Sequence, residues 1–210
     1  AMEFLSDDLH NYISKHTTEA PKFLNELERE TWVKVVMPRM LSGHVQGQIL
    51  KMFSCMAKPK YILEVGTFTG YASHYLVEGL EADGEFHAVE INEELKSIIL
   101  KYWQKNPRFE QMKLHLGSAG DILKVLQRPW DFIFLDADKR GLLDYYELLV
   151  PQMPIGGIMQ QGRQALRLVR LFLMELRDHW RFGMYSITCE SHDAARPRTH
   201  AVSIVRSHCV

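Results

Sequence analysis

From residue 61 onward, short apolar runs alternate with stretches of helical character, and this alternation limits the fold more than any other feature. The runs are rich in β-branched and aromatic residues, and the expected strands are 61–67, 85–92, 112–118, 130–137 and a Gly-led fifth at 151–159. Strands separated by helices form βαβ units, which assemble into a parallel sheet covered by helices. The sequence therefore predicts a doubly wound, mostly parallel α/β sheet.

The two ends of the chain depart from this alternation. Residues 182–190 and 199–206 have strand character with no helix between them, which predicts an antiparallel hairpin at the sheet edge and a total of seven strands. The first 58 residues have helical periodicity interrupted by Pro38 and Gly43. We expect one domain over 1–210, with a helical N-terminal cap at 1–58 and a core at 59–210.

Composition excludes several classes of protein. The net charge is −1 over 210 residues, so the clustered basic excess of a nucleic-acid-binding protein is not expected. No apolar run reaches the length of a membrane span, and the N-terminal residues do not resemble a signal peptide. The three cysteines have no metal-like spacing, and we interpret them as free thiols. These features favour a cytoplasmic protein that binds neither nucleic acid nor membrane.

Polar and glycine residues stand where the first three strands end, which is where open α/β sheets bind ligands. Gly66 and Gly70 allow a tight turn and the close approach of a ligand, although an ordinary strand–helix turn would also explain them. Glu90 ends the second strand and is placed to accept hydrogen bonds from ribose hydroxyls; the alternative is a solvated carboxylate that caps the next helix. Gly117 and Ser118 form a small third tip that suits an adenine edge.

The fourth strand ends in two carboxylates and an ammonium group. Asp136 offers oxygen ligands of the kind that Mg²⁺ prefers. Lys139, three residues later, would lose its proton more easily beside a metal and act as a general base. An Asp–Lys surface pair with Asp138 as a helix cap explains the same residues equally well.

Taken together, the segments ILEVGTFTGYAS, AVEINEEL, LHLGSAGDIL and DFIFLDADK resemble one family in both order and spacing. They are similar to the cation-dependent class I O-methyltransferases of the caffeoyl-CoA and catechol types, and most of all to the caffeoyl-CoA-like and bacterial branch. The likeness covers about residues 5–159. It implies a Rossmann-like fold, a homodimer, a small phenolic substrate, the cofactor S-adenosylmethionine and Mg²⁺ or a similar divalent cation.

The resemblance also implies roles for particular residues. Lys139 would be the base, and Asp136 would be both a metal ligand and a neighbour of the cofactor. The other cofactor contacts would come from Leu41, Ser42, Glu64, Gly66, Thr67, Tyr71, Ala72, Glu90, Ser118, Ala119 and Asp138.

One stretch departs from the family pattern. Relatives usually follow the fifth strand with an Asp-Asn pair that completes the cation site, but Gly162 and Arg163 stand at these places. Either the chain lacks this part of the site, or a further segment belongs between about Met159 and Gln160. The first interpretation leaves an alternative function, a homologue that binds S-adenosylmethionine with impaired or metal-independent catalysis.

Overall fold

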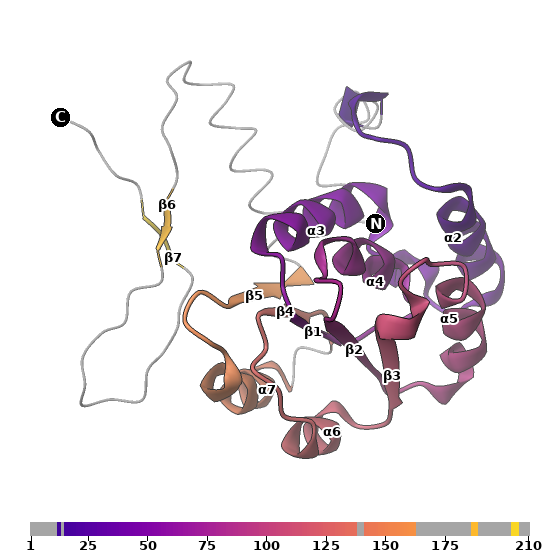
Figure 1. Ribbon diagram of the computed structural model, residues 1–210. Helices are drawn as coiled ribbons and strands as arrows, with labels where there is room; N and C mark the ends of the chain where they lie inside the picture. Colours follow the sequence, from indigo (N-terminus) through magenta and orange to yellow (C-terminus); the bar gives the residue numbers. More distant parts are fainter. Residues whose placement is uncertain (1–11, 14, 138–140, 163–185, 189–202, 206–210) are drawn as a thin grey trace, which may run out of the picture.

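The computed structural model describes residues 12–13, 15–137, 141–162, 186–188 and 203–205. Its centre is a parallel sheet of five strands in the order β3-β2-β1-β4-β5 (Figure 1). The strands are β1 Tyr61–Val65, β2 Glu85–Glu90, β3 Met112–Leu116, β4 Phe132–Leu135 and β5 Ile158–Gln161. The predicted Rossmann-like parallel α/β architecture is confirmed.

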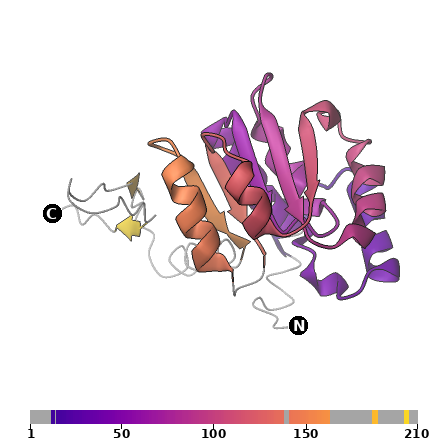
Figure 2. The same cartoon turned by 90° about the horizontal axis from the view of Figure 1, so that it is seen from below.

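Helices cover both faces of the sheet because the buried strands are apolar on both sides (Figures 1 and 2). One face packs against α2 Lys22–Lys34, α3 Gly43–Ala57, α4 Tyr71–Leu76 and α5 Lys96–Trp103. The other packs against α6 Ala119–Val125 and α7 Leu142–Leu149. The neighbours Ile62 and Leu63 of β1 belong to different cores, as the alternation of side chains along a strand requires.

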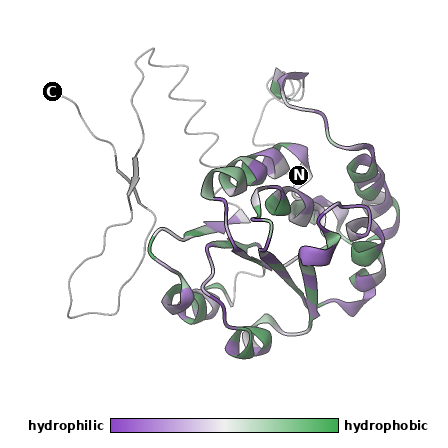
Figure 3. Ribbon diagram, viewed as in Figure 1, coloured by the Kyte–Doolittle hydropathy of each residue, from purple (hydrophilic) through white to green (hydrophobic). Residues whose placement is uncertain are grey.

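The residues after Ala57 explain why helix α3 ends there. α3 ends at Ala57, and Lys58 then adopts a left-handed conformation with φ 46° before Pro59. Between α2 and α3, the short 3₁₀ helix η1, Pro38–Met40, carries the chain to the sheet edge where the strands end. The helices show both green and purple in Figure 3, as expected for elements with one buried and one solvated face.

The register brings the carboxyl ends of the strands to one edge. Val65 of β1 pairs with Val89 on one side and with Leu135 on the other. Residues that follow these three strands therefore lie near one another, which is what the predicted site requires.

The C-terminal prediction is borne out only in part. β6 Ser186–Thr188 and β7 Ser203–Val205 pair antiparallel, as the predicted hairpin does, but they form a two-stranded sheet of their own. The seven-stranded sheet is thus not confirmed. The pattern of residues 163–178 predicts a helix, but these residues lie outside the described part of the chain, and the division into cap and core stays a prediction. Within the described part of the chain, no helix is long and apolar enough to cross a membrane.

Candidate active site

The turn after β1 is shaped by glycine and by the neighbouring strand tips. Gly66 has φ 92°, and a Cβ atom there would lie 2.8 Å from backbone atoms of Asp136 and Ala137. The backbone N–H groups of Gly66 and Asp136 donate to the carbonyls of Val89 and Val65, at 2.9 and 2.8 Å. Glycine is required at 66 because the tips of β1 and β4 meet there without room for a side chain.

Glu64 is the most unusual residue of this edge. Its side chain is fully buried, and Oε2 accepts a hydrogen bond from Ser73 Oγ at 2.5 Å, whereas Oε1 has no hydrogen-bond partner among the described residues. Burial, together with the smaller effect of the nearby Asp136 and Glu90 carboxylates, raises the pKa of this carboxyl to about 8. A cation placed beside Oε1 would relieve both the missing contact and the repulsion.

Glu90 lies at the end of β2, buried and held in a fixed orientation. Its Oε2 accepts from the backbone N–H of Phe68 at 2.7 Å, and its Oε1 accepts from the N–H of Asn92 at 2.9 Å. Asn92, not Glu90, caps the following 3₁₀ helix η3, Glu93–Leu95. The interpretation of Glu90 as a solvated helix cap is therefore wrong, and its remaining lone pairs are left to accept ligand hydroxyls.

The third tip lies beside Glu90. The N–H of Gly117 donates to the carbonyl of Glu90 at 2.9 Å, so the ends of β2 and β3 are joined. Ser118 is exposed and makes no capping bond with its side chain, and Ala119 is buried at the start of α6. Ser118 thus follows directly on the backbone link that joins β3 to the end of β2.

A cleft opens between these tips and the segment before α3. Eight residues expected at the cofactor line it, namely Leu41, Ser42, Glu64, Gly66, Thr67, Tyr71, Ala72 and Asp136. Met40, Phe68 and Thr69 also line it and were not predicted. Glu90, Ser118 and Ala119 lie on the neighbouring tips, while Asp138 and Lys139 fall outside the described residues.

The sequence offers only part of a signal for the three residues that were missed. Phe68 and Thr69 lie within the turn between Gly66 and Gly70, so their nearness to the cleft follows from that turn. Met40 is an exposed apolar residue next to Leu41, and only the path of η1 brings it to the strand tips.

The end of β5 differs from the pattern of a cation site. β5 pairs with β4 in register through Met159 and Gln160, and the further segment between these residues stays an alternative. Gly162 follows, and a Cβ atom there would overlap the Asp136 carboxylate. Among the described residues no three His, Cys, Asp or Glu side chains form a metal-binding group. A divalent cation therefore does not fit this part of the chain.

Comparison with known proteins decides the family. The model of the O-methyltransferase family matches residues 14–165, which is well over half of the chain. The chain belongs to the O-methyltransferase family. Its curated relatives include a caffeoyl-CoA O-methyltransferase from Eucalyptus gunnii, 32% identical over 73% of this chain, and one from Arabidopsis thaliana, 29% identical over 73%. The chain covers only 64% and 62% of these two proteins, somewhat less than two thirds of their length.

Solved structures agree with this family at the level of the fold. An O-methyltransferase from Bacillus cereus, solved with SAH, superposes with a TM-score of 0.67 at 21% identity, covering 84% of this chain and 90% of that one. TomG from Streptomyces achromogenes, solved with SAM, gives 0.69 at 20% identity over 86% of this chain and 90% of that one. These likenesses show the same Rossmann-like methyltransferase fold.

The described residues suit S-adenosylmethionine. This cofactor carries an ammonium and a sulfonium group, and the carboxyl of Glu64 lies near those of Asp136 and Glu90, which suits a positively charged ligand. The orphaned Oε1 of Glu64 is the observation that fits best, because a buried carboxylate oxygen without a partner is rare in folded proteins.

Proposed function

We propose that this chain is an S-adenosylmethionine-dependent O-methyltransferase that acts on a small phenol of the catechol or caffeoyl type. The observation that carries the proposal is Glu64, a buried carboxyl with one unpartnered oxygen, beside Asp136 and Glu90 in an O-methyltransferase family member. The carboxylates of Asp136 and Glu90, joined by Glu64 once it ionises, favour a cationic ligand over a neutral or anionic one.

Each residue of the site then has a task. Glu64 would hold the charged methionine end of the cofactor, and Tyr71 and Ala72 would close around it. Glu90, oriented by the N–H groups of Phe68 and Asn92, would accept the ribose hydroxyls, with Ser118 and Ala119 at the adenine. Leu41 and Ser42 would cover the cleft, which they already line together with Gly66 and Thr67.

When bound, S-adenosylmethionine supplies an electrophilic methyl group on sulfur. Lys139 would take the proton from the acceptor hydroxyl, so that the phenolate oxygen forms a bond to the methyl carbon as the carbon–sulfur bond breaks. Asp136 and Asp138 would position the reactants, and much of the rate would come from this alignment. The proposed reaction uses no divalent cation, because the described residues do not fit one.

The test combines binding with turnover. Calorimetry with SAH should show one site per chain, and mass spectrometry should detect a methylated phenol and SAH after incubation with S-adenosylmethionine and a panel of catechols. Lys139→Ala should abolish turnover and leave the SAH affinity within about twofold. Lys105→Ala, which removes an exposed lysine paired with Glu26, is the matched control and should change neither quantity.

A second candidate, a homologue that binds S-adenosylmethionine without methyl transfer, is favoured by Gly162 at the end of β5. SAH binding without turnover on any phenol, with or without added cation, would support it. Unchanged turnover in Lys139→Ala would instead remove that residue as the base.

A homodimer and a cytoplasmic site of action also belong to this proposal. Both rest on the family resemblance and on composition. Size-exclusion chromatography with light scattering tests the first, and localisation of a tagged chain in its own cells tests the second.

A further inference from the structure

The end of β5 lacks the groups that a chelated cation needs. Gly162 offers no side chain, and its α-carbon lies so close to Asp136 that any Cβ atom would meet the carboxylate. The carbonyl of Gly162 accepts a hydrogen bond from a neutral group, the side-chain amide of Gln46, at 3.3 Å. The position beside Asp136 is thus occupied by backbone and not by an oxygen ligand.

The chain that follows offers no substitute. From Gly162 to Met174 the sequence contains no Asp, Glu, Asn or His, but it contains three arginines at 163, 167 and 170. Hard cations such as Mg²⁺ take oxygen ligands, and a guanidinium group supplies only donors and a positive charge. The sequence after β5 therefore disfavours a divalent cation.

Uncharged amides stand at this end of β5 in place of carboxylates. Gln160 is buried, and neither its Nε2 nor its Oε1 has a hydrogen-bond partner within the described part of the chain. Gln46 of α3 is also buried. Ile158 packs into the core that α3 covers, and Gln160, two residues further along β5, lies on the same face of the sheet. A carboxamide offers a carbonyl acceptor and N–H donors but no negative charge, so these two side chains do not replace a carboxylate ligand.

We propose that methyl transfer in this chain takes place without a chelated divalent cation, and that the acceptor needs only one hydroxyl group. The inference rests on the proposed function. Chelation is what requires two vicinal oxygens on the acceptor, because both must reach the same metal ion. A general base needs a single acidic hydroxyl, so phenols with one hydroxyl are substrates as well as catechols.

The chemistry balances with the groups already named. The acceptor hydroxyl gives its proton to the base, its oxygen forms the bond to the methyl carbon, and the sulfonium becomes the neutral sulfur of SAH. Without a cation to lower the pKa of the hydroxyl, the rate should follow the intrinsic acidity of the phenol. More acidic single-hydroxyl phenols should therefore react faster than unsubstituted phenol.

The first experiment measures Mn²⁺ binding by electron paramagnetic resonance, with the protein saturated by SAH. The signal of free Mn²⁺ should be undiminished by an equimolar amount of wild-type protein. Stoichiometric Mn²⁺ binding that disappears in Asp136→Asn would overturn the proposal. SAH binding is measured separately in the same samples, so a chain that fails to bind SAH refutes the proposed function and is recognised as such.

A gain-of-function variant supplies the control. Gly162→Asp combined with Arg163→Asn restores the family pair, and the Asp136 carboxylate, being a side-chain end, can rotate to make room. We expect this variant to bind one Mn²⁺ while it keeps SAH binding. An SAH-binding variant that still ignores Mn²⁺ would show that these two positions are not what excludes the cation, against the proposal.

Turnover gives the second readout. Excess EDTA should change the wild-type rate by less than about twofold, and single-hydroxyl phenols should be methylated within about tenfold of catechols of equal acidity. Turnover that is lost in EDTA and restored by Mn²⁺ would overturn the proposal, as would activity confined to vicinal diols. Absence of turnover under every condition would refute the acceptor claim together with the proposed function.

Discussion

Two glutamates on adjacent strands of the sheet have opposite surroundings. Glu64 lies near the carboxyl end of β1, fully buried, with one oxygen unpartnered and a pKa raised to about 8 by burial. Glu85 begins β2 at the other edge of the sheet, where Lys113, followed by His87, lowers its pKa to about 2 through hydrogen bonds. The pKa of a glutamate is therefore raised at one edge of the sheet and lowered at the other.

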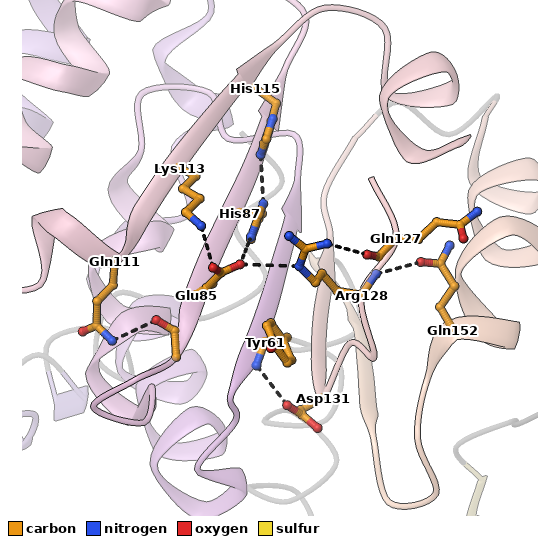
Figure 4. Close-up of polar contacts among 11 residues, drawn as sticks. Tyr61, Glu85, His87, Gln111, Lys113, His115, Gln127, Arg128, Asp131 and Gln152 are labelled. Carbon is orange, nitrogen blue, oxygen red and sulfur yellow. Dashed lines mark hydrogen bonds and ion pairs between the residues drawn. The ribbon is translucent and has the colours of Figure 1, made fainter. Parts of the chain in front are cut away.

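The surroundings of Glu85 are saturated, as Figure 4 shows. Lys113 Nζ lies 2.7 Å from Oε1, and Arg128 Nε lies 3.5 Å from Oε2. The ring Nε2 of His87 is 3.0 Å from Oε2, and its Nδ1 is 2.9 Å from Nε2 of His115. Burial lowers the pKa of His87 and favours its neutral form. Its Nε2 then donates to the ionised Glu85 carboxylate, its Nδ1 accepts, and His115 donates from its Nε2.

This difference in hydrogen bonding indicates which edge of the sheet binds a ligand. At the Glu85 edge every polar group described above has a protein partner. The cluster of Glu85, His87, Lys113, His115 and Arg128, here called the Glu85 group, therefore links β2 to β3 and to the segment before β4. At the Glu64 edge a buried oxygen has no partner among the described residues, and Asp136 and Glu90 disfavour the ionisation of Glu64, so the unliganded site is unsatisfied. Such unsatisfied groups are kept where binding or catalysis repays them.

The largest expected effect concerns stability at the Glu64 edge. The folded carboxyl keeps its proton up to about pH 8, whereas its ordinary pKa is 4.5, so unfolding releases a proton between these values and wild-type stability falls as pH rises. Glu64→Gln has no such loss. At pH 9 it should exceed the wild type by on the order of 4 kcal/mol in urea unfolding, and at pH 4 the two should agree. A difference that is independent of pH would contradict the raised pKa.

The next effect concerns the ligand. At pH 9, where Glu64 is ionised, Glu64→Gln should weaken S-adenosylmethionine binding by roughly 30-fold, because a buried charged partner of the cofactor is lost. From pH 7 to 9 the wild-type affinity should rise by about tenfold, and that of the variant should stay flat. Calorimetry measures both, and Glu85→Gln is the matched control at the opposite edge. Equal loss in the two variants would mean that Glu64 acts through the fold and not on the ligand.

The contrast between the edges also explains what the sequence could predict. The five strands and the glycine turn at Gly66 and Gly70 follow from local signals, the hydrophobic period and the residues that permit positive φ. Glu90 could be placed at a strand tip for the same reason. The part of the cleft formed by the strand tips could also be predicted, because a parallel sheet brings the ends of its strands together.

Other features depend on information that no local pattern contains. The Glu85 group needs the register that sets His87 opposite Lys113, and it needs Arg128 to come back from the segment after α6. Phe68 adopts φ 53° although no glycine marks the position, and Met40 reaches the cleft only through the path of η1. The place of the β6–β7 pair likewise depends on long-range pairing, which periodicity does not determine.

The smallest expected effect concerns the Glu85 group. Glu85→Gln removes the anion from Lys113, His87 and Arg128, but the side chain is 30% exposed, so solvent screening limits the loss to about 1 kcal/mol of unfolding free energy near pH 7. Because the pKa of Glu85 is lowered to about 2 from 4.5, this stability is present above pH 4.5 and is lost as pH falls toward 2. Urea unfolding from pH 7 down to pH 2.5 measures it, with Glu110→Gln, an exposed glutamate in the turn before β3, as the control.

The SAH affinity of Glu85→Gln should stay within about twofold of the wild type, since this edge is satisfied without a ligand. A loss of SAH affinity as large as that in Glu64→Gln would mean that the two edges are coupled through β2, and the distinction between a structural and a ligand-binding glutamate would fail.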